Sequence, residues 1–196
     1  MEDVIANGQT VQMAAVASSD PAIDAWLKAD AKRSMKIGIT GLKHMAKLSQ
    51  ETYAYSATVT LDGVRAFDAS NHGTGGADMY HPLKGYAGPG ERSIDGWLKA
   101  NTPKIEAYEM ELDNSLEIVV GDLISDEIGR RVIKRMLSTK ILLIDKADGA
   151  DAIFICNGKP TPEALARMKA GIAAGRIAGR LVNGDAEAIE IARTLV

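Results

Sequence analysis

The residues best suited to chemistry in this chain of 196 residues lie in one short segment, Asn71 to Pro82. This segment holds three glycines within four residues, two of the three histidines, a tyrosine and a final proline. Glycine tolerates positive φ, so successive glycines can turn their N–H groups toward one point and form an anion-binding nest. Core packing does not require such a segment, and we therefore expect any binding site of the chain to lie here.

A phosphate-bearing ligand is the class of molecule that this segment predicts. The N–H groups of Gly73, Gly75 and Gly76 would hold phosphate, and neighbouring side chains would contact a base or ribose. The predicted ligand-binding residues are Asn71, His72, Gly73, Thr74, Gly75, Gly76, Tyr80, His81, Lys84 and Arg65. The order of residues matches neither a P-loop nor a dinucleotide-binding fingerprint. A strand exit with flexible glycines is the alternative interpretation.

Catalytic and metal-binding patterns are weak throughout the sequence. His72 and His81 are nine residues apart, whereas zinc sites combine three or four ligands at closer spacing. Cys156 lies in an apolar stretch, where a thiol usually acts as a small buried hydrophobe. Ser49 and Ser70 lack the Gly-x-Ser-x-Gly signature of a nucleophilic serine. We predict no catalytic residue, no metal and no cofactor.

The composition favours a globular protein that acts on neither membranes nor nucleic acid. Apolar residues make up 46% and charged residues 25% of the chain, and the net charge is −3. Non-specific binding to a phosphate backbone needs a basic excess that is missing here. No apolar run reaches the length of a membrane-spanning helix, and the first six residues do not resemble a signal peptide. With a single cysteine, the chain fits a reducing compartment, and we expect a cytoplasmic location.

A β-hairpin should deliver the chain to the glycine segment. Residues 51–61 and 64–70 are rich in β-forming residues, and Asp62-Gly63 between them is typical of a two-residue type I′ turn. The turn predicts four pairs on one face, namely Leu61 with Val64, Val59 with Ala66, Ala57 with Asp68 and Tyr55 with Ser70. The face that carries Tyr53, Tyr55, Ala57, Val59 and Leu61 should meet the core. Residues 71–92 should form a long irregular segment.

The rest of the chain predicts helices and short strands. In the first half we expect a helix from Asp20-Pro21 that carries Trp26, an edge strand over 35–40 and a helix capped by Ser93. A long amphipathic helix should follow over 113–137, and then strands over 140–144 and 152–156 that are joined at Asp148-Gly149. The chain should end with a helix from Thr161, a weak strand over 180–183 and a helix capped by Asp185. Because strands occur in groups, we predict an α+β fold with a small mixed or antiparallel sheet. Residues 1–34 form an N-terminal extension with a short helix, and residues 35–196 form a single α+β domain. Trp26 either fastens its helix to the body or packs on another subunit.

Three sequence segments also carry a resemblance. They are Leu48-Ser49-Gln50-Glu51-Thr52-Tyr53 with the hairpin that follows, Asn71-His72-Gly73-Thr74-Gly75-Gly76, and Tyr80-His81-Pro82. In these segments the chain resembles a group of small uncharacterised phage and bacterial proteins, from about Met35 to the end. The resemblance implies a phage-type accessory protein, and brings no established activity or catalytic residue.

These observations lead to one functional expectation and two alternatives. We expect a homo-oligomeric protein that sequesters a small anionic ligand, such as a nucleotide-derived defence signal, without catalysis. The first alternative is an enzyme that modifies or cleaves such nucleotides, with His72 or His81 as the acid or base. The second is an inhibitor that binds a host protein through the N-terminal extension and Trp26.

Overall fold

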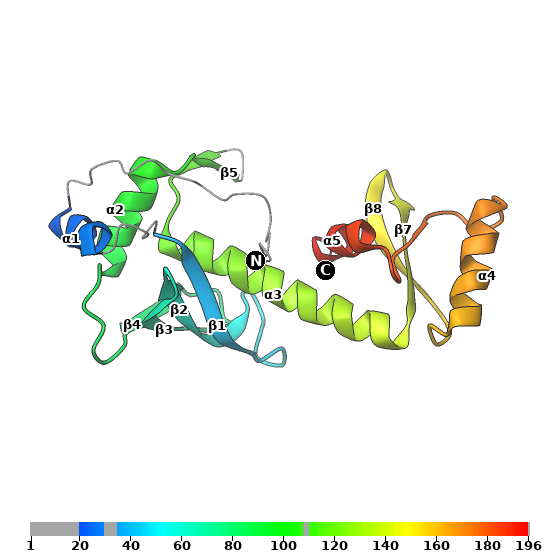
Figure 1. Ribbon diagram of the computed structural model, residues 1–196, viewed down its shortest axis with the longest axis horizontal. Helices are drawn as coiled ribbons and strands as arrows, with labels where there is room; N and C mark the ends of the chain where they lie inside the picture. Colours follow the sequence, from blue (N-terminus) through cyan, green and yellow to red (C-terminus); the bar gives the residue numbers. More distant parts are fainter. Residues whose placement is uncertain (1–19, 30–34, 108–109, 196) are drawn as a thin grey trace. The chain divides into compact units, whose positions relative to one another are not determined.

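The computed structural model describes residues 20–29, 35–107 and 110–195, in which helices and antiparallel strands combine as α+β (Figure 1). The predicted fold class is therefore confirmed. Contacts divide the chain into two compact units, Met1–Ile124 and Ser125–Val196, and each is described by itself below. Of the predicted N-terminal extension, residues 1–19 and 30–34 lie outside the described residues, so its boundary at residue 34 stays a prediction.

The N-terminal unit is built on a four-stranded antiparallel sheet. Its strands follow chain order as β1 (Ile37–His44), β2 (Ala54–Leu61), β3 (Val64–His72) and β4 (Met79–Pro82). β1 lies at the edge, as its sequence predicts. The expectation of an irregular segment over residues 71–92 is wrong at β4, because Met79–Pro82 pairs with Phe67–Ser70 of β3.

The hairpin of β2 and β3 turns where the sequence predicts. Asp62 and Gly63 both have positive φ, at 48° and 79°, as a type I′ turn requires. Leu61 pairs with Val64, but after Thr60 and Arg65 the register shifts by one residue, and Val59 pairs with Phe67. The three further predicted pairs on this face are therefore wrong, because a β-bulge at Ala66 adds one residue to β3.

The bulge has a clear physical cause in the sequence of β3. In the predicted register Asp68 and Ser70 would face the core, opposite Ala57 and Tyr55. The extra residue turns Phe67, Ala69 and Asn71 inward instead, and they are 1%, 1% and 6% exposed. Burying Phe67 and exposing Asp68 avoids a carboxylate without a partner in the core.

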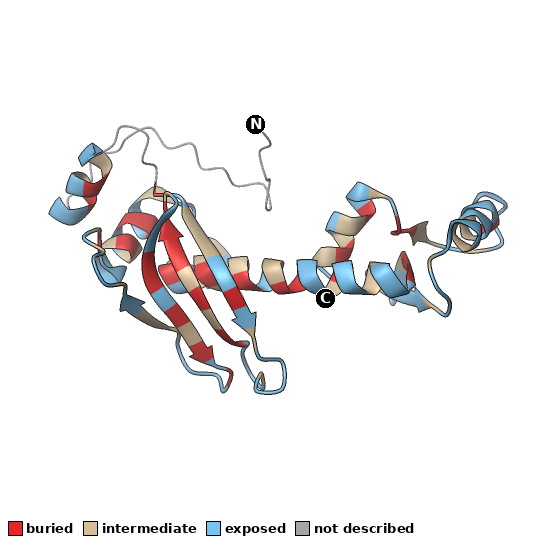
Figure 2. Cartoon of the chain, turned by 60° about the horizontal axis from the view of Figure 1, so that its bottom comes forward, coloured by how far each residue is buried: buried red, intermediate tan, exposed pale blue. Residues whose placement is uncertain are grey.

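Helices and side chains cover the inner face of this sheet. Tyr55, Ala57, Val59 and Leu61 are buried as predicted, whereas Tyr53 is exposed. Three helices contribute buried side chains, namely α1 (Pro21–Ala29), α2 (Glu91–Asn101) and the first part of α3 (Leu116–Thr139). These side chains are Ile23, Trp26, Ile94, Trp97, Leu98, Leu116, Val120 and Ile124. Figure 2 shows the buried positions concentrated on the central strands.

A local capping side chain sets the start of α1 but not that of α2. The carboxylate of Asp20 accepts a hydrogen bond from the Ala22 N–H at 2.8 Å and caps α1 as predicted. α2 begins earlier than predicted, because Gly90 and not Ser93 is its N-cap. The short hairpin of β5 (Ile105–Ala107) and β6 (Met110–Leu112) was missed by the sequence analysis.

The C-terminal unit contains a three-stranded sheet with helices on both faces. Its strands are β7 (Ile141–Ala147), β8 (Ala150–Cys156) and β9 (Arg180–Leu181), in the order β8-β7-β9. α4 (Pro162–Ala173) covers one face, and α5 (Ala186–Arg193) with the end of α3 covers the other. The predicted turn at Asp148-Gly149 and the predicted caps Thr161 and Asp185 are confirmed. Within the described parts of the chain, no helix has both the length and the apolar character needed to cross a membrane.

Candidate functional site

Asn71 is the residue that organises the predicted glycine segment. Its Oδ1 accepts hydrogen bonds from the Gly73 N–H at 2.7 Å and the Thr52 hydroxyl at 3.0 Å. Its Nδ2 donates to the Gly76 carbonyl at 2.8 Å and to Asp78 Oδ1 at 2.9 Å. All four hydrogen-bonding positions of the amide are therefore used. Asn71 therefore holds the loop together from the inside through hydrogen bonds.

Two of the three predicted phosphate donors of this loop have partners inside the protein. The Gly73 N–H donates to Asn71, and the Gly75 N–H donates to the Thr52 hydroxyl at 3.3 Å. A Cβ atom added at Gly75 would collide with the carboxylate of Glu51, which lies directly against the loop. Both donors are occupied and an adjacent negative charge opposes an anion, so this geometry does not favour phosphate at Gly73 and Gly75, and binding there stays a prediction.

A hydrogen-bonded carboxylate closes the other end of the loop. Asp78 Oδ2 accepts from the hydroxyls of Tyr55 at 2.5 Å and Tyr80 at 3.1 Å. Burial raises the pKa of both phenols, and the charge of Asp78 raises it further. The Asp78 N–H in turn donates to Glu117 Oε1 at 3.2 Å. The predicted ligand residue Tyr80 is thus part of an acidic internal network.

The other predicted loop residues lie on the surface. Thr74, Gly76, His72 and His81 are exposed. His72 ends β3 opposite Ala54, while His81 lies on β4. Ligand binding by these residues stays a prediction.

The structure also brings Ser49 next to His44. His44 Nε2 lies 3.2 Å from Ser49 Oγ, the distance of a base from a serine nucleophile. Ser49 Oγ, however, accepts from the Ala54 N–H at 2.9 Å and donates to the Met45 carbonyl at 3.3 Å. With its proton directed at a carbonyl, Ser49 serves the turn before β2. Among the described residues, no three His, Cys, Asp or Glu side chains are grouped closely enough to hold a metal ion.

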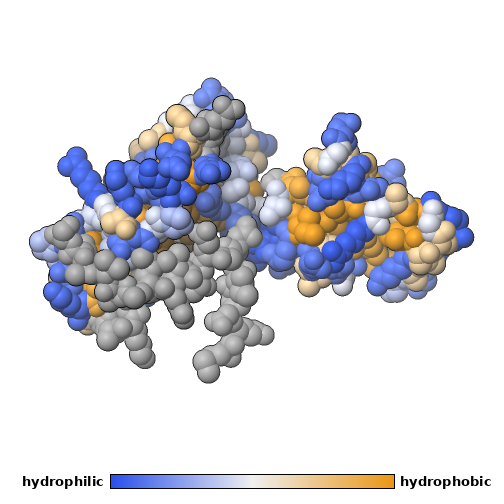
Figure 3. All heavy atoms as spheres, turned by 90° about the horizontal axis from the view of Figure 1, so that it is seen from above, coloured by the Kyte–Doolittle hydropathy of each residue, from blue (hydrophilic) through white to orange (hydrophobic). Residues whose placement is uncertain are grey.

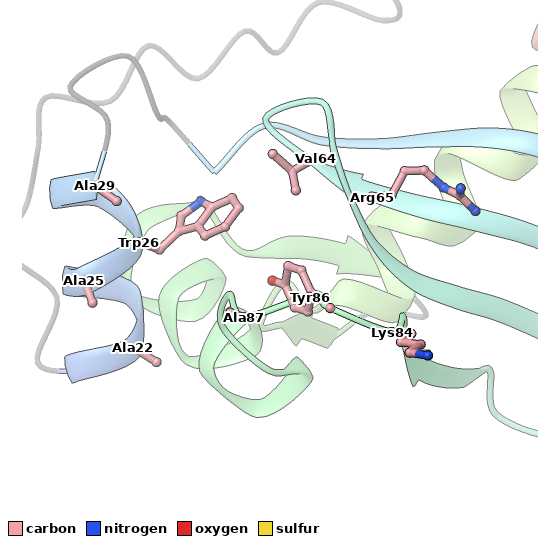
Figure 4. Close-up of a pocket in the computed structure, with 10 residues that line it drawn as sticks. Ala22, Ala25, Trp26, Ala29, Val64, Arg65, Lys84, Tyr86 and Ala87 are labelled. Atoms are coloured by element: carbon pink, nitrogen blue, oxygen red, sulfur yellow. The ribbon is translucent and has the colours of Figure 1, made fainter.

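A groove of about 640 Å³ lies at the other end of the hairpin (Figure 4). Its lining comes from α1, from the start of β3 and from the segment after β4, and comprises Ala22, Ala25, Trp26, Ala29, Val64, Arg65, Lys84, Gly85, Tyr86 and Ala87. Arg65 and Lys84, two of the predicted ligand-binding residues, are therefore brought together. Both are exposed, and among the described residues neither belongs to an ion pair.

The bulge of β3 positions the two cations. The Ala66 carbonyl accepts a hydrogen bond from the Leu83 N–H at 2.9 Å, one step beyond the ladder of β3 and β4. Arg65 comes directly before Ala66, and Lys84 comes directly after Leu83. The bond between Ala66 and Leu83 therefore holds the backbones of Arg65 and Lys84 near each other. In Figure 4 Arg65 and Lys84 lie on the far side of Tyr86 from Trp26, and the guanidinium of Arg65 points away from the indole ring.

Aromatic packing fixes the wall of the groove. Trp26 is 8% exposed, and its Nε1–H donates to Asp62 Oδ2 at 3.3 Å. The Tyr86 ring lies 6.1 Å from the Trp26 ring and 5.3 Å from the Phe67 ring, between centroids. The Tyr86 hydroxyl donates to the Pro89 carbonyl at 2.8 Å. Trp26 therefore fastens α1 to the hairpin of its own chain.

Sequence analysis missed the apolar half of this groove, although one signal was present. Ala22, Ala25 and Ala29 recur at helical spacing beside Trp26, so α1 carries a stripe of small residues next to one large ring. Such a stripe leaves room at the surface, and all three alanines are exposed.

Comparison of the chain with family profiles, curated proteins and solved structures finds no match.

Proposed function

We propose that this protein captures a small anionic ligand in the groove of Arg65, Lys84, Trp26 and Tyr86, and releases it unchanged. The observation that carries the proposal is the meeting of two cations with an apolar wall in one groove, on a chain whose net charge is −3. The volume falls within the range of small-molecule sites, roughly 300–1,000 Å³.

The side chains of the groove suit recognition. A guanidinium and an ammonium bind phosphate or carboxylate oxygens through charge-assisted hydrogen bonds. Because Trp26 is almost fully buried, it forms a wall, and the exposed alanines of α1 leave space for an apolar or aromatic part of the ligand. A nucleotide combines both parts.

Two further observations bear on the identity of the ligand. Resemblance to phage and bacterial accessory proteins favours a nucleotide-derived defence signal that the protein sequesters in the cytoplasm. Among the described residues, no histidine, carboxylate or cysteine lines the groove, where Arg65 and Lys84 supply charge. This supports capture over the alternative of a nucleotide-cleaving enzyme.

Isothermal titration against a panel of nucleoside phosphates and cyclic dinucleotides tests the proposal. We expect at least one nucleotide to bind, and Arg65→Glu or Lys84→Glu to weaken its binding at least ~10-fold, since each reverses one contacting charge. Lys43→Glu on β1 is the matched control, because it changes the net charge equally at an exposed position outside the lining of the groove.

Three outcomes would contradict the proposal. The first is that no member of the panel binds. The second is that Arg65→Glu and Lys43→Glu weaken binding equally, which would indicate long-range charge only. The third is that His72→Ala abolishes binding while Arg65→Glu does not, which would return the site to the glycine loop. Mass spectrometry of the recovered nucleotide distinguishes capture, which leaves it intact, from cleavage.

A further inference from the structure

The outer edge of β8 is an unprotected strand edge. In the order β8-β7-β9, β8 hydrogen-bonds only to β7, and no other described strand pairs with it. Its register with β7 is regular over Ile141–Ala147, without a bulge. Residues 152–156 contain no charge and no proline. Proteins commonly guard strand edges with such features, because a bare edge pairs with other chains.

Large apolar side chains stand on both faces of this edge. Phe154 is 43% exposed and Ile155 is 54% exposed. Phe154 pairs with Leu143, which packs with the α4 cluster, whereas Ile155 pairs with Leu142, which packs with the α5 cluster. The helices therefore cover β7 on both faces but leave β8 partly bare. Figure 3 shows apolar surface gathered on the C-terminal unit.

The sequence of the edge is nearly symmetric about Phe154. It reads Ala152-Ile153-Phe154-Ile155-Cys156, with a small residue at each end and isoleucine on each side of the centre. If two copies pair antiparallel about Phe154, then Phe154 meets Phe154, Ile153 meets Ile155, and Ala152 meets Cys156. Every pair is apolar, as a self-complementary two-fold interface requires.

Charges at the two ends fit the same register. Asp151, which pairs with Lys146 of its own chain at 2.7 Å, falls opposite Asn157 just past the end of β8, and a ladder continued through this bend makes Lys159 of the second copy a further cation near it on the same face. The two-fold axis produces this contact twice. Moving the centre by one residue would instead place Asp151 opposite Ile155, or would place Ala152 opposite Gly158 beyond the end of β8.

We propose that two copies of this chain associate through β8, so that their three-stranded sheets join into one continuous sheet. The occupant of the edge is thus a second copy, and the interface is isologous and closes at two. This inference is independent of the ligand-binding groove.

Sedimentation velocity over a concentration series tests the interface on the full chain. We expect the wild type to be a dimer, and Phe154→Lys and Ile155→Lys to raise its dissociation constant by about 100-fold. Leu48→Lys is the matched control, because Leu48 is 55% exposed in the N-terminal unit, and it should leave the dimer intact. Circular dichroism confirms that each variant is folded.

Disulfide trapping tests the register without disturbing the fold. Opposite residues of an antiparallel pair have Cα atoms about 4.5–5.5 Å apart, within disulfide range. In Ala152→Cys the new thiol should meet the native Cys156 of the second copy and give a covalent dimer on mild oxidation. Within one chain these positions are about 13 Å apart along the strand and cannot bond. Ala150→Cys should trap little, since its partner position is Gly158.

The inference would be overturned by a wild type that is monomeric at every concentration, or by a dimer that survives both lysine substitutions. Covalent ladders beyond the dimer from Ala152→Cys would show an open assembly and overturn the two-fold geometry. Equal trapping by Ala152→Cys and Ala150→Cys would overturn the register. If both lysine variants fail to fold, the trapping experiment alone decides.

Discussion

Asn71 and Asp78 show how a single side chain decides what a glycine-rich loop does. The loop has the composition of an anion nest, yet the amide of Asn71 takes up the Gly73 N–H and the Gly76 carbonyl. Asp78 then takes two phenol hydroxyls and the second hydrogen of the Asn71 amide. The glycines therefore allow a tight path for the backbone around buried polar groups.

Removing the carboxylate of Asp78 should destabilise the N-terminal unit. Asp78→Ala leaves the hydroxyls of Tyr55 and Tyr80 and one hydrogen of Asn71 without an acceptor, and we expect a loss of about 2–4 kcal/mol. Urea unfolding followed by tryptophan fluorescence measures it. Asp68→Ala, an exposed carboxylate on β3, is the control and should change stability by less than ~0.5 kcal/mol. Equal effects of both substitutions would contradict the role of Asp78.

The same network should make the protein sensitive to alkali. The pKa of each of Tyr55 and Tyr80 is raised from the ordinary 10.0, first by burial and then by Asp78. Above pH 10 the unfolded chain loses these protons while the folded chain keeps them, so stability falls as the pH rises.

Tyrosinate absorbance during an alkaline titration measures this effect. We expect two of the five tyrosines to ionise only as the protein unfolds. In Tyr55→Phe this delayed signal should shrink by one phenol. Smooth ionisation of all five tyrosines in a protein that stays folded would contradict the expectation.

At the scale of elements, the sequence predicts what is decided locally. The type I′ turn at Asp62-Gly63 and the caps Asp20, Thr161 and Asp185 follow from residues within a few positions of each other, and all are confirmed. β4 could not be predicted, because Met79–Pro82 is short and becomes a strand by pairing with β3.

The register of the hairpin depends both on the local turn and on which side chains the core accepts. Turn geometry alone places Asp68 in the core, and the structure avoids this with the bulge at Ala66. An inward-facing Asp68 opposite Ala57 was itself a signal against the regular register. Only part of the groove was predicted, since its residues come from segments far apart in the sequence, and only Arg65 and Lys84 were named beforehand.

At the scale of the whole molecule, the two compact units should respond separately to core substitutions. Both tryptophans, Trp26 and Trp97, belong to the N-terminal unit, so fluorescence reports on that unit alone. Leu142→Ala, at a fully buried position of β7, should destabilise the C-terminal unit by about 3 kcal/mol.

Denaturation followed by two signals measures this separation. Leu142→Ala should shift part of the circular dichroism transition and leave the tryptophan transition in place. Val59→Ala, at a fully buried position of β2, should shift the tryptophan transition together with the remaining part of the circular dichroism transition. A single transition that either substitution moves in both signals would contradict the division into two units, since α3 runs through both of them.

The extra residue Ala66 in β3 affects both the packing of the hairpin and its bond to the segment after β4. Without Ala66, the ladder would run regularly from the turn, and Phe67, Ala69 and Asn71 would still face the core. The carbonyl that receives the Leu83 N–H would be gone, and with it the bond that holds Lys84 close to Arg65. Deletion of the Ala66 codon therefore removes one small buried side chain from the core together with the bond to Leu83 at the edge of the groove, so the length of β3 is constrained as well as its residue types.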